Sequence, residues 1–470
     1  MGYNRHALCV ETRDCSVVQF PATALILGQI SRDPQLQGAR LGRQLLQRNQ
    51  AILGSFGVTG ELVYDGLETR VRLTTDTTVG AIPLVSPTTG KTELGLVIHP
   101  RLEWLGVGEI LGIMGWKIIP EILGLPLLPR SARNVPPWVI SAIVLQRIEM
   151  LLNQLQRRFE FVDTDLPAPR GAVRWDIYAT TRIPRMEFLS VPCRFSDLRD
   201  DSDLKAALHF ALKQQLGSLQ SQRVAGFFVL QLIELCTHLL ERVNSVAARP
   251  PTPALMSSWF NMPVRSGVFR DALQAIEWTV EERGVAGLAE LQGLPWRMSM
   301  DEFYEAWVET IASKLSQRVG GILKIGRKRE TITPISWEKP YQGSQKSLIP
   351  DIVIYRESET IVIDAKYKRH WEDIQIAGWH SVTEEIQRRH RSDLMQVLAY
   401  SGLFNAPSVI ACIAYPCRRP TWESLKRRNL RYHKASIHSG GRRVNLILIV
   451  LPMVADIEEA VDTLLSAFAT

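Results

Sequence analysis

The sequence predicts a mixed α/β protein, α+β overall, with three successive regions. Residues 1–130 contain apolar runs of strand-like content separated by turn residues. Residues 131–295 carry apolar side chains at helical spacing, and residues 296–470 combine a predicted helix with two apolar strands that are expected to pair as a hairpin. A chain of 470 residues has the length of about three domains. We therefore expect a strand-rich N-terminal domain, a helical middle region and a C-terminal sheet domain.

The N-terminal region is expected to contain strands and one early helix. Ala24–Ile30 and Leu62–Leu73 have strand-like content, whereas Leu41–Leu53 has helical spacing. Ile82–Val85 and Leu94–His99 flank a Ser-Pro-Thr-Thr-Gly segment, which predicts a turn between two strands.

The segment Gly90-Lys91-Thr92 lies in this turn and invites comparison with phosphate-binding loops. Such a loop needs a glycine five residues before Gly90, where Val85 stands, and it must open a helix, whereas Glu93–His99 is extended and apolar. We expect a hairpin tip here and no nucleotide-binding site.

Three helices are expected in the middle region, at Pro136–Phe159, Asp203–Leu216 and Phe227–Val243, because each has an apolar stripe at helical spacing. Two stretches between them, Arg170–Trp175 and Val191–Phe195, are expected to form a short extended pair. We find no catalytic constellation in this region or in the one before it.

A predicted β-hairpin organises the C-terminal region. Its apolar runs, Ile352–Tyr355 and Thr360–Ile363, flank a polar Arg-Glu-Ser-Glu turn. Asp351 opens the first strand; Asp364 and Lys366 end the second, where alternation places both on one face. Two carboxylates and an ammonium are costly in a sheet core unless they are paired or bind a metal. The arrangement favours metal-assisted attack on a phosphodiester, with Mg²⁺ held by the two aspartates and water oriented or activated by the lysine.

The same residues resemble the signature of the PD-(D/E)XK nucleases. Pro350-Asp351 is followed by Asp364-Ala365-Lys366, in the order that this superfamily shows. The resemblance implies a restriction-endonuclease-like mixed-sheet domain over residues 296–470. The alternative is a buried, salt-bridged hairpin in an unrelated α/β domain.

Two flanking helices extend the resemblance. Gln396 and Tyr400 lie four residues apart, hence on one helical face, as in the RecB-like branch of these nucleases. In the predicted helix Met300–Leu315, Glu305 resembles the acid of the first helix. The resemblance implies that Glu305 completes the metal ligands and that Gln396 and Tyr400 hold phosphate or water. Glu309, one turn further along, is a competing candidate.

Several segments follow one another in the order seen in McrC, the nuclease subunit of McrBC-type restriction systems. They are an Arg-Gly segment, a Cys-Arg-Phe stretch, two helices, the Phe-Tyr-Glu helix and the nuclease signature. The similarity extends roughly over residues 90–455 and is best over 300–416. The resemblance implies an AAA+ GTPase partner, McrB-like, that forms a ring, recognises DNA and translocates. It also implies that the N-terminal half of this chain docks on the ring and stimulates hydrolysis. The first 80 residues and the basic segment Trp422–Lys434 match no motif of the family.

The distribution of charge supports contact with double-stranded DNA. Between Lys314 and Arg443 there are 24 Lys and Arg against 12 Asp and Glu, although the whole chain has a net charge of only +7. Such cations can neutralise phosphates without reading bases. Trp371 and Trp379 could stack on bases, although packing is the more common use. The basic clusters are Arg327–Arg329, Arg388–Arg391, Arg418-Arg419, Lys426–Arg428 and Arg442-Arg443.

Cysteine usage and hydropathy predict a cytoplasmic protein. The six cysteines show neither dense pairing nor zinc-site spacing, so free thiols in a reducing compartment are expected. No apolar stretch reaches the length of a membrane span, and we expect no membrane partner. The cysteines are Cys9, Cys15, Cys193, Cys236, Cys412 and Cys417.

Together these features predict a Mg²⁺-dependent endonuclease subunit of an McrBC-like restriction system acting in phage defence, for which Mn²⁺ can substitute. Two alternatives stay open. One is a catalytically idle activator of the GTPase, and the other is a DNA repair nuclease that works without a motor.

Overall fold

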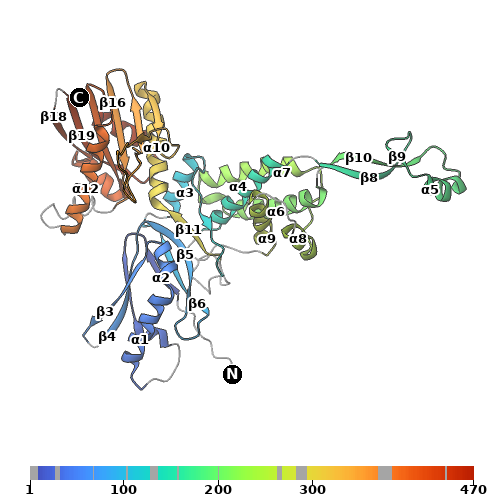
Figure 1. Ribbon diagram of the computed structural model, residues 1–470, viewed down its shortest axis with the longest axis horizontal. Coiled ribbons are helices and arrows are strands. Elements are labelled where there is room, and N and C mark those ends of the chain that lie inside the picture. The colour runs from blue at the N-terminus through green and yellow to red at the C-terminus, as the bar shows by residue number, and fades with distance from the viewer. Residues whose placement is uncertain are drawn as a thin grey trace. The chain divides into compact units, whose positions relative to one another are not determined.

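A computed structural model shows an α+β protein with several mixed sheets, as the sequence predicts (Figure 1). Contacts divide the chain into two compact units. The first comprises Met1–Pro136, Ala225–Phe228 and Gly284–Thr470, and the second comprises Pro137–Val224 and Val229–Arg283. The structure describes residues 9–26, 32–66, 68–101, 104–126, 136–155, 158–199, 201–261, 267–281, 294–368, 384–439 and 442–469.

The division into domains at 1–130, 131–295 and 296–470 stays a prediction. In the structure, the N-terminal and C-terminal regions pack together in one unit, and most of the middle region forms the other.

A five-stranded sheet in the first unit joins the N-terminal region to the start of the C-terminal region. β1 and β6 are parallel, and β5 pairs antiparallel with both β6 and β11. β11 belongs to the C-terminal region by sequence, yet it pairs with N-terminal strands and runs directly into the next helix. The order is β1 (Cys9–Arg13), β6 (Thr92–His99), β5 (Thr78–Val85), β11 (Trp296–Ser299) and β7 (Glu121–Ile122).

A second N-terminal sheet is antiparallel, in the order β2 (Val17–Pro21), β4 (Glu68–Thr74), β3 (Thr59–Asp65). Helices α1 (Pro34–Arg48) and α2 (Gln50–Ser55) lie between its strands in the sequence. The Asp33 side chain caps α1 by accepting from the Leu36 amide at 3.1 Å, and Pro34 occupies the first turn.

Three predictions for this region can be compared with these elements. Leu41–Leu53 is helical, as expected, apart from a break at Asn49. Leu62–Leu73 is extended but forms two strands of a hairpin, β3 and β4, which turns at Gly66 with φ +60°. The predicted strand Ala24–Ile30 is wrong over Ala24–Ile26, because Ala22–Ile26 forms a 3₁₀ helix. A short apolar run does not distinguish a strand from a buried helix. Residues 27–30 lie outside the described part.

The turn between β5 and β6 is a hairpin tip, as expected. Gly90 lies there with φ +72°, a conformation in which glycine has no steric penalty. The following residues form strand β6 rather than a helix, so Gly90-Lys91-Thr92 lacks the geometry of a phosphate-binding loop.

The C-terminal sheet has six strands and is mixed. β15 and β16 form the predicted hairpin, with Ile352 opposite Ile363; β16, β17 and β19 are parallel to one another. Its central strands are apolar and buried, as is usual where helices cover a sheet. The order is β12 (Ile322–Ile325), β15 (Ile352–Tyr355), β16 (Glu359–Ala365), β17 (Ser408–Cys417), β19 (Arg442–Pro452) and β18 (Tyr432–Ser439).

Within the described residues, the helices that accompany this sheet are α10 (Met300–Val319), α12 (Glu384–Ser401), α13 (Arg419–Arg427) and α14 (Ile457–Phe468). The predicted helix Met300–Leu315 corresponds to α10, which Ser299 caps through the Glu302 amide at 3.2 Å. α12 connects the parallel strands β16 and β17, and its Val397 packs with β17 and α13. The smaller elements of this unit are α3 (Trp104–Ile113), β13 (Thr333–Pro334) and β14 (Ser347–Leu348).

The second unit is largely helical. The three predicted helices are confirmed, except that the first ends at Gln154 and its expected last residues begin a strand. Their apolar stripes form the buried core. The helices are α4 (Trp138–Gln154), α6 (Ser202–Ser221), α7 (Phe227–Val243), which starts in the first unit, α8 (Pro253–Phe260) and α9 (Gly267–Val280).

An arm leads away from these helices within the second unit (Figure 1). It consists of β8 (Arg158–Leu166) paired antiparallel with β10 (Val191–Arg199), and of β9 (Ala172–Val173), which pairs with β10. The predicted extended pair is therefore β9 and β10. At the tip, α5 (Trp175–Ile177) continues into further short helical turns up to Arg185.

All six cysteines are free thiols, in agreement with the prediction. Among the described residues, we find no helix with the length and apolarity needed to cross a membrane.

Candidate active site

The hairpin brings Asp351, Asp364 and Lys366 together, as the sequence predicts. Oδ2 of Asp351 accepts from the Ala365 amide at 2.9 Å, which ties the start of β15 to the end of β16. Nζ of Lys366 lies 2.8 Å from Oδ2 of Asp364, and the Asp364 side chain is fully buried. Two carboxylates and one ammonium therefore share the end of the sheet.

Burial dominates the electrostatics of the two aspartates. It raises the pKa of Asp364 to about 7, helped by the charge of Asp351 and opposed by Lys366. It also raises the pKa of Asp351 to about 6, opposed by Lys366 and helped by Glu305. Burial lowers the pKa of Lys366, but the charges of Asp364 and Asp351 outweigh this effect and leave that pKa raised. Such perturbation is typical of functional sites.

The two aspartates fit a hard divalent cation. Neither oxygen of Asp364 accepts an aligned hydrogen bond within the described structure, so the Lys366 ion pair is its main compensation. Mg²⁺ is commonly held by one or two carboxylates, with water and substrate phosphate completing its octahedron. Among the described residues, no group of three or more His, Cys, Asp or Glu side chains is arranged to hold a metal. Asp351 and Asp364 are therefore the candidate ligands that the described structure brings together, and the role of Glu305 as a further ligand stays a prediction.

The two glutamates of α10 have different environments. Glu309 is 1% exposed and forms a bidentate ion pair with Arg327, at 3.1 Å to Nε and 2.6 Å to Nη2. Glu305 is half-buried, and burial followed by the charge of Glu309 raises its pKa. Its charge in turn raises the pKa of Asp351. Glu305 is thus electrostatically linked to the centre, whereas Glu309 is committed to Arg327.

Gln396 and Tyr400 lie on one face of α12, as expected. Nε2 of Gln396 donates to the Tyr400 hydroxyl at 3.0 Å. Tyr400 is 8% exposed, and its pKa is raised by burial and by the charges of Asp364 and Asp351, against the Gln396 hydrogen bond. The structure therefore orients this pair near the aspartates.

A polar cluster beside the centre was missed by the sequence reasoning. Asp393 of α12 is buried; its Oδ1 lies 2.5 Å from Nζ of Lys368, and its Oδ2 accepts from the Tyr415 hydroxyl at 3.0 Å. Nδ1 of His390 lies 3.3 Å from the same hydroxyl. The charge of Asp393 raises the pKa of Asp364. Its spacing gave a usable signal, since Asp393 precedes Gln396 by three residues on the same helix.

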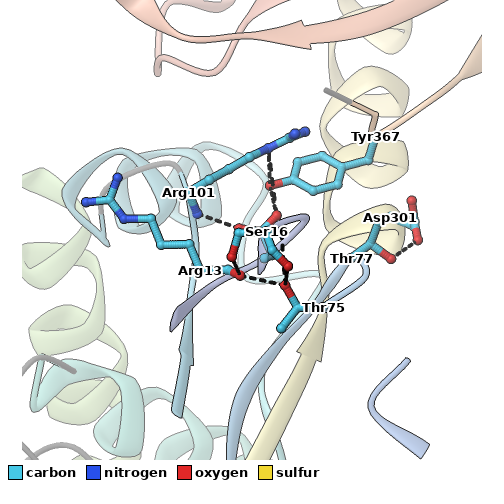
Figure 2. A network of polar contacts seen from close by, with 8 residues as sticks. Arg13, Ser16, Thr75, Thr77, Arg101, Asp301 and Tyr367 are labelled. Carbon is cyan, nitrogen blue, oxygen red and sulfur yellow. Dashed lines mark hydrogen bonds and ion pairs between the residues drawn. The ribbon is translucent and has the colours of Figure 1, made fainter. Parts of the chain in front are cut away.

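A second missed set ties the hairpin to the N-terminal strands. The Tyr367 hydroxyl donates to Oδ2 of Asp14 at 2.8 Å, and Nε of Arg101 donates to the Tyr367 oxygen at 3.2 Å (Figure 2). No sequence signal could have found it, because these residues are separated by up to 353 positions.

The predicted basic clusters are largely exposed, but several members have structural partners. Arg327 pairs with Glu309, Arg419 with Glu423 at 3.1 Å, and Lys426 with Glu459. Arg442 donates to the Phe404 carbonyl. Trp371 and Trp379 lie outside the described residues. Arg427 and Arg428 donate to the carbonyls of Glu423 and Ser424. The exposed cations Lys328, Arg329, Arg388 and Arg391 are the better candidates for phosphate contact.

Comparison with known proteins gives a family match over part of the chain. Residues 296–416 match the family described as McrBC 5-methylcytosine restriction system component. The match covers α10, the hairpin of β15 and β16 with its three charged residues, α12 and most of β17. No curated protein matches the sequence.

Two solved structures from Thermococcus gammatolerans show weak similarity. One is an assembly of McrB AAA+ hexamers with bound McrC, at 12% identity and TM-score 0.41, covering 98% of this chain and 99% of that chain. The other is an McrBC complex, at 10% identity and TM-score 0.28, covering 65% and 88%.

Proposed function

We propose that this chain, whose residues 296–416 match the McrBC restriction-component family, is the Mg²⁺-dependent DNA endonuclease subunit of such a system. One observation carries the proposal most directly. Asp364 is fully buried, without an aligned hydrogen bond in the described structure, beside Asp351 and Lys366 at the end of a hairpin. A buried carboxylate so arranged is costly without a ligand, and a hard cation would compensate it.

Each residue of the centre has a role in phosphodiester hydrolysis. Asp351 and Asp364 would hold Mg²⁺, which when bound polarises the phosphate and lowers the pKa of water. Lys366, held 2.8 Å from Asp364, carries an ammonium that orients water or stabilises the charge developing on phosphate oxygens. Glu305 raises the proton affinity of Asp351 and could act through water. Gln396 and Tyr400 orient phosphate or water as a hydrogen-bonded pair.

The positive charge of the C-terminal region and the description of the matched family both indicate DNA as the substrate. The exposed cations of the C-terminal region provide a sequence-independent attraction for the DNA backbone. The family description names 5-methylcytosine, so DNA that carries this base is the first substrate to test.

An AAA+ GTPase ring, McrB-like, is the proposed partner, because the matched family is a component of a multi-part restriction system. The arm tip is our candidate docking surface. Trp175 is 66% exposed, Phe188 59% and Leu189 90%, although each is large and apolar. Exposed apolar groups that gather at one place mark interaction sites. These three are supported by a hairpin that leads away from the helical core of its unit (Figure 1).

Cleavage assays on methylated and unmethylated plasmid DNA test the proposal, with the AAA+ partner, GTP and Mg²⁺. Asp364→Asn should reduce cleavage to background while the protein stays folded. Glu357→Gln is a matched control, since this exposed carboxylate lies in the turn of the same hairpin. Absence of Mg²⁺-dependent cleavage by the wild-type chain on both substrates would overturn the proposed function.

A further inference from the structure

A buried polar network joins the N-terminal sheet to the residue that follows Lys366 (Figure 2). The Tyr367 hydroxyl donates to Asp14 at 2.8 Å and accepts from Nε of Arg101 at 3.2 Å. The Arg101 guanidinium lies over the Tyr367 ring, with Cζ 4.2 Å from the ring centroid. The backbone amide of Arg101 also donates to Oδ1 of Asp14. We call Asp14, Arg101 and Tyr367 the clamp.

The clamp is almost fully withdrawn from solvent. The Asp14 side chain has no exposure, the Arg101 side chain has 12%, and Tyr367 has 2%. One guanidinium nitrogen of Arg101, Nη1, is buried without a hydrogen-bond partner in the described structure. Buried ionic groups with imperfect compensation contribute little net stability, because desolvation offsets their attraction. A gain in stability therefore explains this buried network poorly. The fixed position that the network gives to Tyr367 explains it better.

The clamp fixes the backbone next to Lys366, because Tyr367 directly follows that residue. The Lys366 ammonium lies against Asp364, whereas the Tyr367 hydroxyl is bonded to Asp14 and Arg101. The Lys368 amide donates to the Lys366 carbonyl at 2.9 Å, so the chain turns at Tyr367 directly after the strand. The Tyr367 ring lies 6.1 Å from the ring of Tyr304, on α10. On the strand side, the Lys366 amide donates to the Ala414 carbonyl at 2.9 Å and continues the ladder between β16 and β17. The ladder and the clamp thus fix adjoining residues.

The N-terminal residues of the clamp are themselves fixed by their strands. Asp14 follows β1 and Arg101 lies two residues beyond β6, and these parallel neighbours end at the same edge of their sheet. The Asp14 amide donates to the His99 carbonyl at 3.0 Å. A second link lies nearby: the Thr77 hydroxyl donates to Asp301, and the Met300 amide donates to the Thr77 carbonyl at 3.0 Å (Figure 2). The N-terminal sheet therefore touches both α10 and the hairpin.

We propose that Asp14, Arg101 and Tyr367 are positioning residues of the nuclease, through which the N-terminal sheet sets the position of the Lys366 ammonium. The inference rests on the proposed cleavage activity and deepens it. It makes the N-terminal strands a structural part of the catalytic centre, in addition to any docking role of the rest of that half. A displacement of about 1 Å at a reacting group can lower a rate by about 100-fold, so a small loosening of residue 367 is sufficient.

Tyr367→Phe is the direct test, because it removes the hydroxyl and keeps the ring. We expect kcat for DNA cleavage to fall by about 10- to 100-fold, with KM for DNA and affinity for Mn²⁺ unchanged. Tyr304→Phe is the matched control, since the Tyr304 hydroxyl is equally buried and has no hydrogen-bond partner in the described structure. Its kcat should equal that of the wild type. Arg101→Lys, which keeps the charge but not the fork geometry, should behave like Tyr367→Phe.

Hydrogen exchange gives a readout that does not need cleavage. The peptide containing Lys366 should exchange faster in Tyr367→Phe than in Tyr304→Phe, with the rest of the C-terminal sheet unchanged. Equal kcat and equal exchange in the two variants would overturn the clamp, as would a joint loss of Mn²⁺ affinity and activity. If the wild type does not cleave DNA, the proposed function fails, and the exchange comparison alone then decides the inference.

Discussion

Asp364 lies next to the last residue of β16 and Lys366 directly follows that strand, and their charged atoms lie 2.8 Å apart where the carboxylate has no exposure. The pair brings a positive group and a metal-ligating group to one face by strand geometry alone. It also leaves the Asp364 oxygens without aligned hydrogen bonds in the described structure. The centre is therefore poorly compensated in the absence of a cation, and its protonation should govern metal binding.

Metal affinity should rise with pH between about 5.5 and 8. The pKa values of Asp364, about 7, and of Asp351, about 6, lie above the ordinary value of 3.8 because of burial. A cation competes with protons for these carboxylates, so it binds weakly at low pH. Calorimetric titration with Mn²⁺ at several pH values measures the effect. An affinity that stays constant or falls as pH rises would contradict the assignment of these ligands.

The same shifts affect stability without metal. A carboxyl group whose pKa is raised on folding makes the folded state bind more protons than the unfolded chain, so the free energy of unfolding decreases as pH rises from about 4 to about 7. A ligand that binds only the folded state opposes this loss. We expect Mg²⁺ to raise the melting temperature more at pH 8 than at pH 5.5. In Asp364→Asn this difference should disappear.

Lys366→Ala should separate metal binding from chemistry. Its ammonium lowers the pKa of Asp364, so its removal should shift Mn²⁺ binding to higher pH without abolishing it. Single-turnover cleavage at saturating metal should slow by about 100- to 1,000-fold, the usual effect of removing one group that stabilises transition-state charge. Loss of metal binding at every pH would mean that Lys366 is structural.

Glu309→Gln should mainly lower stability, whereas Glu305→Gln should mainly lower the cleavage rate. Glu309 is buried in a bidentate pair with Arg327, so Glu309→Gln should lower the free energy of unfolding by about 1.5–3 kcal/mol. Glu305 has no such pair within the described part of the chain but acts electrostatically on Asp351, so Glu305→Gln should leave stability unchanged and reduce cleavage. Urea unfolding and cleavage rates, measured on both variants, decide between them. Full activity in Glu305→Gln would remove that residue from the centre.

Local patterns predicted the elements that carry the aspartates and the lysine. Alternation in the hairpin was sufficient to place Asp364 and Lys366 on one face, and the spacing of Gln396 and Tyr400 was sufficient for their hydrogen bond. Both features depend on residues within one or two elements, where periodicity decides the geometry.

Long-range pairing was not predictable from the same patterns. Nothing in the Trp296–Ser299 segment indicates that it joins the N-terminal sheet, and nothing near Tyr367 indicates Asp14 as its partner. Such contacts depend on which strands pair in three dimensions, and strand pairing leaves little trace in a single sequence. Ala22–Ile26 shows the same limit locally, since a short apolar run fits a 3₁₀ helix as well as a strand.

The arm tip and the active centre should be separable by mutation. We expect the chain with Mg²⁺ alone to cut little DNA, and to cut well when the AAA+ partner and GTP are added. Trp175→Ala with Leu189→Ser should abolish both the GTP-dependent cleavage and the stimulation of the partner's GTP hydrolysis, because large exposed apolar residues dominate binding energy where they dock.

Two controls isolate the arm tip. Val224→Ser changes a residue that is 98% exposed in the same unit but lies outside the arm, and it should have no effect. Asp364→Ala should show the converse of the tip variant, with cleavage lost and stimulation of GTP hydrolysis retained, because Asp364 lies at the end of β16 and not on the arm. The tip variant should still bind Mn²⁺ like the wild type. Full stimulation by the tip variant would exclude the arm as the docking surface, and strong cleavage by the chain alone would favour a nuclease that works without a motor.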